Sequence, residues 1–182
     1  ITEDNRILTG SSDGKIRIWN LEGDCLRILT GHKGEIFDIA SEKNIVVSAC
    51  GDKSIRAYNI DSGECLAIFQ GKMDQVWSIT IKDGIIFAGT SDNNIVVWDL
   101  KKKTYLGTLK GHTEPVKSLI FIKNELLISG GLDGKILFWN VKDFLHRVEH
   151  DTKSDLITQL QMGRTYDILP PTLKNYWHKL RN

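Results

Sequence analysis

The sequence lacks the features that mark several large classes of protein. It has 24 basic and 23 acidic residues, so its formal net charge of +1 creates no overall field that would attract nucleic acid or an anionic membrane. It contains no run of about 18 apolar residues, and therefore no candidate membrane-spanning helix. No secretory signal peptide is visible either. We therefore expect no membrane span, no nucleic acid partner, and a cytoplasmic or nuclear location.

Cysteine is also scarce, with three residues in the chain. Cys25 and Cys65 lie in two similar segments, GDCLRIL and GECLAIF, which predicts packing residues of equivalent strands. Cys50 lies in a third β-type run. We expect all three to be reduced and buried thiols, as is usual in a cytosolic or nuclear protein.

Motifs that would indicate catalysis are absent or weak. The sequence has no G-x-S-x-G nucleophile elbow and no glycine loop of the phosphate-binding type. Residues 146–150 match the H-x-x-E-H pattern of some zinc proteases, but few residues follow that could supply a third ligand, so we interpret them as a polar stretch. The basic run Lys101–Lys103 is interpreted as a solvated turn. We expect no catalytic residue, metal site, cofactor or small-molecule substrate.

What the sequence does contain is a unit of about 40 residues that occurs four times. In each copy, two β-type runs flank a tight turn with an aspartate, and the second run ends on an aromatic residue. The copies cover residues 7–20, 45–59, 85–99 and 126–140. Their turn aspartates and aromatic residues are Asp13 and Trp19, Asp52 and Tyr58, Asp92 and Trp98, and Asp133 and Trp139. A second marker, Gly-His or Gly-Lys, recurs every 40 residues at positions 31, 71 and 111.

These marks resemble the WD-repeat family over residues 7–141. The resemblance implies an all-β fold with about three and a half four-stranded antiparallel propeller blades. The chain enters at a second strand and leaves the repeats after a third, which predicts the C-terminal half of a larger propeller. The alternative is an open blade that pairs with another chain. Residues 142–182 are expected to form a C-terminal extension with short helices near 154–162 and 173–180.

The start of each first strand carries two apolar residues spaced three apart. A spacing of three, where a regular strand gives two, predicts a β-bulge in each first strand. The pairs are Ile36 and Ile39, Val76 and Ile79, and Val116 and Leu119.

The resemblance also implies a hydrogen-bonded network inside each blade, in which His donates to the turn Asp and Ser or Thr accepts from the Trp indole. The fourth repeat has the complete set, His112, Ser129, Asp133 and Trp139. The second has His32, Ser48 and Asp52, with Tyr58 in place of Trp. The third has Lys72 and Ala88 where His and Ser would stand, so its network is predicted to be broken. Because the set recurs in successive repeats, we interpret it as structural and not as a hydrolase triad.

For function, the resemblance implies a non-catalytic protein–protein interaction scaffold whose partners are other proteins or peptide motifs. The binding surface is expected where each first strand begins, because the bulge turns side chains outward. The candidate partner-binding residues are Glu35, Phe37, Gln75, Trp77, Lys117 and Leu132. For Trp77 the alternative is that its ring fills a gap between blades. The alternative function is a substrate-recognition subunit of a ubiquitin ligase, of the F-box or SOCS type.

Overall fold

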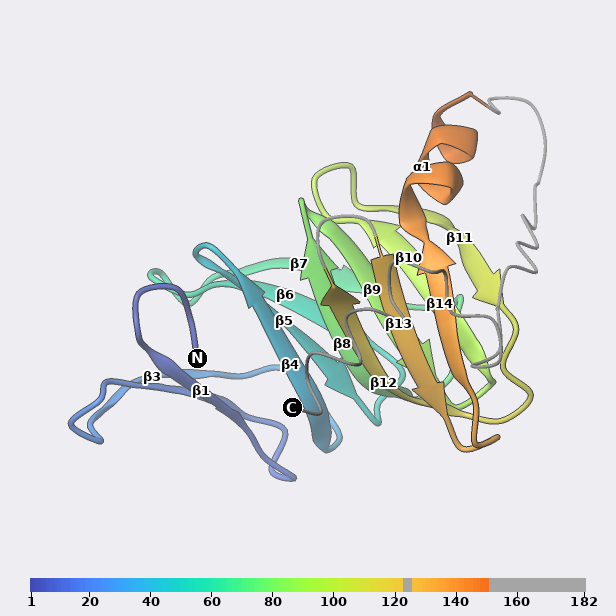
Figure 1. The fold of residues 1–182 in the computed structure, drawn as a ribbon. Coiled ribbons are helices and arrows are strands. Elements are labelled where there is room, and N and C mark those ends of the chain that lie inside the picture. The colour runs from blue at the N-terminus through green and yellow to red at the C-terminus, as the bar shows by residue number, and fades with distance from the viewer. Residues whose placement is uncertain (123–125, 151–182) are drawn as a thin grey trace, which may run out of the picture.

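The computed structural model describes residues 1–122 and 126–150 of the chain. These residues form four antiparallel sheets that stand side by side in chain order, as successive propeller blades do (Figure 1). The two middle sheets have four strands each and the two outer sheets have three. The expectation of an all-β fold with about three and a half blades is therefore confirmed.

Each sheet is built from consecutive strands of the chain. The first sheet contains β1 (Ile7–Gly10), β2 (Ile16–Trp19) and β3 (Cys25–Leu29). The second contains β4 (Ile36–Glu42), β5 (Ile45–Cys50), β6 (Ile55–Asn59) and β7 (Cys65–Phe69). The third contains β8 (Val76–Lys82), β9 (Ile85–Thr90), β10 (Asn94–Asp99) and β11 (Thr104–Lys110). The fourth contains β12 (Val116–Ile122), β13 (Leu126–Gly131) and β14 (Ile136–Asn140).

The turn aspartates begin the tight hairpins that join the second and third strands of each blade. In all four turns the residue after the aspartate has a positive φ, a conformation that Gly and Asn adopt at low cost. These residues are Gly14 (φ 74°), Lys53 (63°), Asn93 (71°) and Gly134 (73°). The shared geometry explains why the Asp-x pair recurs in register with the aromatic residue.

The predicted β-bulges are confirmed in the three first strands that the structure describes. The pairing register shifts between Ile36 and Asp38 in β4, between Val76 and Ser78 in β8, and between Val116 and Ser118 in β12. The residue left between each pair is Phe37, Trp77 or Lys117. A bulge turns the extra side chain away from the regular alternation, so these three side chains occupy equivalent positions on successive blades.

The hydrophobic core lies between the sheets, and alternate residues of a strand serve opposite interfaces. In β5, for example, Val46 packs toward the first sheet and Val47 toward the third. The described residues form three buried clusters, one at each interface between neighbouring sheets. The first strands β4, β8 and β12 lie next to one another, which brings the starts of the blades together.

A helix that the sequence did not predict, α1 (Val141–His150), follows β14 directly. Its Phe144 is fully buried in the cluster between the third and fourth sheets, and a Cβ at Gly107 of β11 would lie 3.0 Å from the Phe144 ring. The first turns of the predicted extension therefore pack on the blades. The helices expected near 154–162 and 173–180 lie outside the described residues. None of the helices in the described part is long and apolar enough to cross a membrane.

The prediction of three buried thiols is wrong for two of them. Cys50 is buried, but Cys25 and Cys65 are exposed. Both begin the last strand of their sheet, β3 or β7, which is the strand farthest from the side where β4 and β8 meet. Side chains at this outer edge reach solvent, so equivalent repeat positions did not imply burial. Lys101–Lys103 lies exposed in the turn between β10 and β11.

Candidate functional site

The fourth sheet contains a chain of buried hydrogen bonds that crosses the blade. Trp139 Nε1 donates to Ser129 Oγ at 2.8 Å, and Ser129 Oγ lies 2.7 Å from His112 Nε2. His112 Nδ1 lies 3.0 Å from the Asp133 carboxylate. Since the indole can only donate, the simplest assignment has the Ser129 hydroxyl donating to Nε2 and the Nδ1–H donating to Asp133. The four predicted residues thus lie together in one continuous chain.

The Asp133 carboxylate is held ionised by its hydrogen bonds. Burial alone would raise its pKa, but the backbone N–H groups of Thr113 and Lys135 and the His112 imidazole outweigh burial and lower the pKa from 3.8 to about 2. Asp133 therefore links the loop before β12 to the turn before β14.

The second sheet has a similar network with one difference from the expectation. His32 Nδ1 lies 2.9 Å from Asp52 Oδ2, and His32 Nε2 lies 2.8 Å from Ser48 Oγ. Tyr58, expected to take the place of Trp, does not bind Ser48; its hydroxyl donates to the Thr30 carbonyl at 3.0 Å. The phenol oxygen extends beyond the position of an indole nitrogen and reaches the preceding loop. A residue that the sequence reasoning missed, Ser54, donates to Asp52 at 2.6 Å, so the small polar residue after the turn is part of the network.

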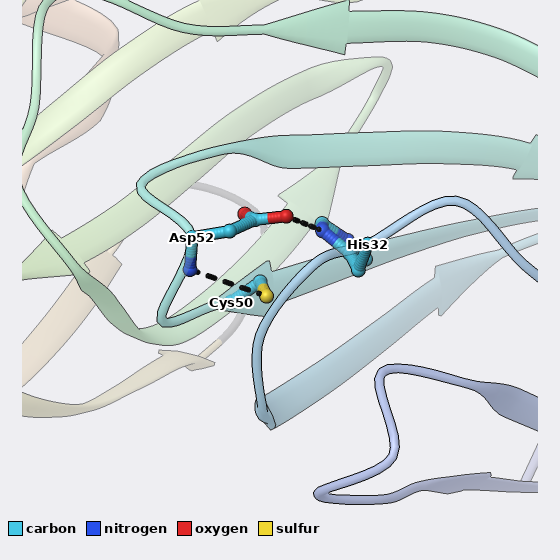
Figure 2. Close-up of side chains that lie close together, drawn as sticks. All are labelled: His32, Cys50 and Asp52. Atoms are coloured by element: carbon cyan, nitrogen blue, oxygen red, sulfur yellow. Dashed lines mark hydrogen bonds and ion pairs between the residues drawn. The ribbon is translucent and has the colours of Figure 1, made fainter.

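His32, Cys50 and Asp52 place their ligand-type atoms within 4.8 Å of one another, which raises the question of a metal site (Figure 2). The contacts favour a structural role instead. Both imidazole nitrogens of His32 already have partners, and Cys50 Sγ accepts a hydrogen bond from the Asp52 backbone N–H at 3.4 Å. Burial raises the pKa of the Cys50 thiol to about 11, which disfavours the thiolate that metals bind. Burial also lowers the pKa of His32, so its imidazole is neutral at pH 7.

The third sheet has the aromatic residue and the turn aspartate of the network, Trp98 and Asp92, but neither its serine nor its histidine. Trp98 is buried, and its Nε1 has no hydrogen-bond partner among the described residues. Ala88 stands ten residues before Trp98, at the spacing that joins Ser129 to Trp139. Lys72 lies outside the network, with its Nζ 5.9 Å from the centre of the Tyr105 ring. In the first sheet, the same spacing of ten brings Trp19 Nε1 to Thr9 Oγ1 at 2.9 Å.

The predicted partner-binding residues lie along one edge of the sheets, here named the rim and defined as Glu35, Phe37, Gln75, Trp77, Lys117 and Leu132. A repeated backbone bond builds this edge: the residue just before each turn aspartate donates to the carbonyl of the residue before the first strand. The pairs are Gly51 with Glu35 (3.0 Å), Ser91 with Gln75 (2.9 Å) and Leu132 with Pro115 (2.9 Å). The bond holds each turn beside the start of the first strand of the same blade.

The rim side chains differ in how they contact the blades. Phe37 is 44% exposed and its ring lies against Gly51, while Leu132 is 58% exposed. Trp77 is half-buried; its Nε1 donates to Gln75 Oε1 at 3.4 Å, and Lys117 Nζ lies 3.3 Å over the centre of its ring. Trp77 is absent from the three buried clusters of the described residues, so its ring is not part of the core between the blades.

Comparison with known proteins decides the family. The WD40 family, described as WD domain, G-beta repeat, matches residues 2–20, 23–59, 63–99 and 103–140. The chain belongs to the WD-repeat family.

Individual WD-repeat relatives are similar over different parts of this chain. It is 26% identical over 140 residues to a p21-activated protein kinase-interacting protein 1-like of Danio rerio, covering 75% of this chain and 38% of that protein. It is 30% identical over 141 residues to the ribosome biogenesis protein YTM1 of Vanderwaltozyma polyspora, covering 77% and 26%. It is 38% identical over 61 residues to a ribosome biogenesis protein WDR12 homologue of Arabidopsis thaliana, covering 30% and 14%. The chain thus spans well under half the length of these relatives.

The repeat pattern did not predict two carboxylates that join the second and third blades. Asp38 Oδ2 accepts from the Ile79 backbone N–H at 2.9 Å, and burial raises the pKa of its carboxyl. Glu42 accepts from the N–H groups of Asp83 and Gly84 at 2.6 and 2.9 Å. A signal for Asp38 was present, because the equivalent positions in β8 and β12 are the serines Ser78 and Ser118.

The H-x-x-E-H pattern at residues 146–150 lies within α1. Its first residue, His146, is exposed. The side chains of Glu149 and His150 lie outside the described part, so the structure adds no ligand geometry to that pattern.

Proposed function

We propose that this WD-repeat chain is a non-catalytic scaffold that binds partner proteins through the rim. The observation that carries the proposal is the position of Trp77. It is a large, half-buried aromatic side chain on a bulge, outside the core clusters, at an edge where Phe37 and Leu132 are exposed. Tryptophan is enriched among the residues that dominate binding energies at protein interfaces. Exposed apolar side chains gathered at one edge are typical of an interaction surface.

The relatives favour a role in the assembly of other macromolecules. Two of the three are named for ribosome biogenesis and the third for its interaction with a protein kinase. Ribosome assembly begins in the nucleus, so of the two expected compartments we favour the nuclear one. None of these three names refers to a ubiquitin ligase, and the alternative of a substrate-recognition subunit is not favoured.

The hydrogen-bonded networks support the non-catalytic part of the proposal. Ser129 is fully buried, and its hydroxyl is engaged by both His112 and Trp139. A nucleophile needs access to its substrate and a base free to take its proton. The network instead connects a loop, a strand and a turn, as a structural element would.

We further propose that additional blades cover the outward faces of the first and fourth sheets. Apolar side chains on these faces are exposed, among them Ile28 (50%) and Ile120 (57%). In the middle two sheets, both faces contribute to buried clusters. The curated relatives are longer than the part that this chain matches, which leaves room for such blades.

The test compares variants of the full-length protein that contains this segment. Trp77→Ala should weaken partner binding by roughly 2 kcal/mol or more, which is a loss of about thirtyfold in affinity, while the melting temperature is retained. Leu132→Ser, on the same rim, should give a smaller reduction. The matched control is Leu21→Ser, because Leu21 is 64% exposed in the β2–β3 turn at the opposite edge.

Quantitative mass spectrometry of the purified complexes, and co-sedimentation with ribosomal precursor particles, would measure the change. Partner recovery that is the same for Trp77→Ala and Leu21→Ser would show that the rim is not the binding surface. Unfolding of Trp77→Ala would show that the side chain has a structural role instead.

A further inference from the structure

Lys117 and Trp77 come from equivalent positions of neighbouring blades and contact each other. Both are the extra residue of a bulge, in β12 and β8 respectively, and these two strands are neighbours. Lys117 Nζ lies 3.3 Å from the centre of the Trp77 ring, which is within the range of a cation–π interaction. The face of this indole is therefore in contact with a positive charge from the protein itself.

The surroundings of the ring suit a cation better than an anion. Exposed carboxylates stand in the loops before β4 and β12, at Glu35 of the rim and at Glu114. Asp74, in the loop before β8, is paired with Lys53 at 2.6 Å. The Trp77 Nε1–H is directed to Gln75, so the indole offers its π face and not its N–H donor to an incoming group. A tryptophan face attracts ammonium and guanidinium groups through its quadrupole.

Lys117 holds this position weakly enough to be displaced. Its side chain is exposed, and no ion pair fixes its ammonium group among the described residues. A cation–π contact at an exposed site is among the weaker interactions of a protein, and the lysine stem is flexible. A partner cation held by a longer segment of bound chain can therefore replace the ammonium group of Lys117.

We propose that the Trp77 ring is a receptor for an arginine or lysine side chain of a partner protein, and that Lys117 occupies this receptor in the free protein. The proposal rests on the proposed function, because it names the partner chemistry of the same rim. Lys117 then acts as an internal competitor: the apparent affinity for a partner cation is reduced by the fraction of time that the ring is occupied.

The test uses two short peptides and the full-length protein labelled with 5-fluorotryptophan. One peptide is acetyl-Ser-Arg-Gly-amide and the other carries citrulline, a neutral isostere of arginine. The fluorine resonance of Trp77, assigned from its loss in Trp77→Phe, reports binding at this ring. We expect the arginine peptide to shift that resonance more strongly than the citrulline peptide. Lys117→Met, which keeps the length of the side chain and removes the charge, should tighten arginine binding about threefold.

Two controls separate the ring contact from general electrostatics. Lys33→Met removes one positive charge from an exposed position in the loop before β4 and should leave the arginine affinity within about twofold of the wild type. Trp77→Phe keeps a weaker aromatic face, and Trp77→Leu removes it. Binding to these variants is measured by saturation transfer observed on the peptide. The preference for arginine over citrulline should be smaller in Trp77→Phe than in the wild type and absent in Trp77→Leu.

The proposal is overturned if the two peptides shift Trp77 equally, or if Lys117→Met and Lys33→Met change the affinity by the same factor. A lower melting temperature of Lys117→Met without a change in arginine binding would also overturn it, since Lys117 would then only join two blades. Each of these three outcomes leaves the proposed scaffold intact when partner recovery still depends on Trp77. Loss of that dependence would contradict the scaffold proposal itself.

Discussion

The third and fourth sheets each bury a tryptophan at the same strand position, but the two indoles have different surroundings. Trp139 donates to Ser129 and completes a chain that ends at Asp133. Trp98 Nε1 has no partner among the described residues. Its ring instead packs between Phe69 and Tyr105, with 5.2 Å between ring centres on each side.

The comparison separates the contribution of ring packing between blades from that of the hydrogen-bonded chain within a blade. Ring packing between blades is sufficient to place the tryptophan, because the third sheet retains its strand order and register without the network. The hydrogen-bonded chain gives the indole N–H an acceptor. It also joins the loop before the first strand to the turn between the second and third strands. A buried donor without a partner costs about 1–3 kcal/mol, so the third sheet is expected to be the less stable of the two.

The largest effect that breaks the comparison is expected from His112→Ala. The substitution leaves the Ser129 hydroxyl and the Asp133 carboxylate without the imidazole between them, and it should lower the free energy of unfolding by about 1–3 kcal/mol. The matched change in the third sheet, Lys72→Ala, alters an exposed side chain and should cost about 0.5 kcal/mol or less. Urea unfolding of the full-length variants would measure both values.

Equal losses from the two substitutions would mean that the network contributes no more than an exposed lysine. Ser118→Ala is a suitable control, since Ser118 is an exposed serine of the fourth sheet and should leave the stability near that of the wild type.

A smaller and pH-dependent effect is expected from Asp133→Asn. The pKa of Asp133 is lowered in the folded protein from 3.8 to about 2. A carboxyl with a depressed folded pKa stabilises the fold above its unfolded pKa, and this contribution is lost as the pH falls through the folded value. The stability difference between wild type and Asp133→Asn should therefore be constant above about pH 5 and shrink between about pH 4 and pH 2. A difference independent of pH would show that the charge of Asp133 is not what its partners stabilise.

The features predicted correctly from the sequence are those that recur with the repeat. The constant spacing between turn aspartate and aromatic residue predicted the hairpins. This spacing is constant because all four turns share one geometry, with a positive φ at the residue after the aspartate. The spacing of three in Ile36/Ile39 and its equivalents gave the bulges. A repeated pattern carries this information because each copy must solve the same packing problem.

The features that the sequence reasoning missed belong to one blade or one junction. Tyr58 fills the tryptophan position, but its hydroxyl binds Thr30 and not Ser48. Asp38 replaces a serine and joins two blades. The exposure of Cys25 depends on the distance of β3 from the first strands, which the local pattern does not report. Contacts between different repeats need the three-dimensional arrangement.

The smallest expected effect is a gain, obtained by rebuilding the missing chain in the third sheet. Ala88→Ser places a hydroxyl ten residues before Trp98, at the spacing that joins Ser129 to Trp139, and Lys72→His supplies the imidazole between that hydroxyl and Asp92. The double variant should raise the free energy of unfolding by about 0.5–1.5 kcal/mol, the net value of a satisfied hydrogen bond. Ala88→Ser alone should gain less, because its buried hydroxyl would lack the imidazole as acceptor. Ala88 is fully buried, so any crowding by the added oxygen would oppose the gain. Comparing the double variant with each single variant isolates the coupling. A double variant no more stable than the sum of its singles would show that the third sheet cannot form the chain found in the fourth.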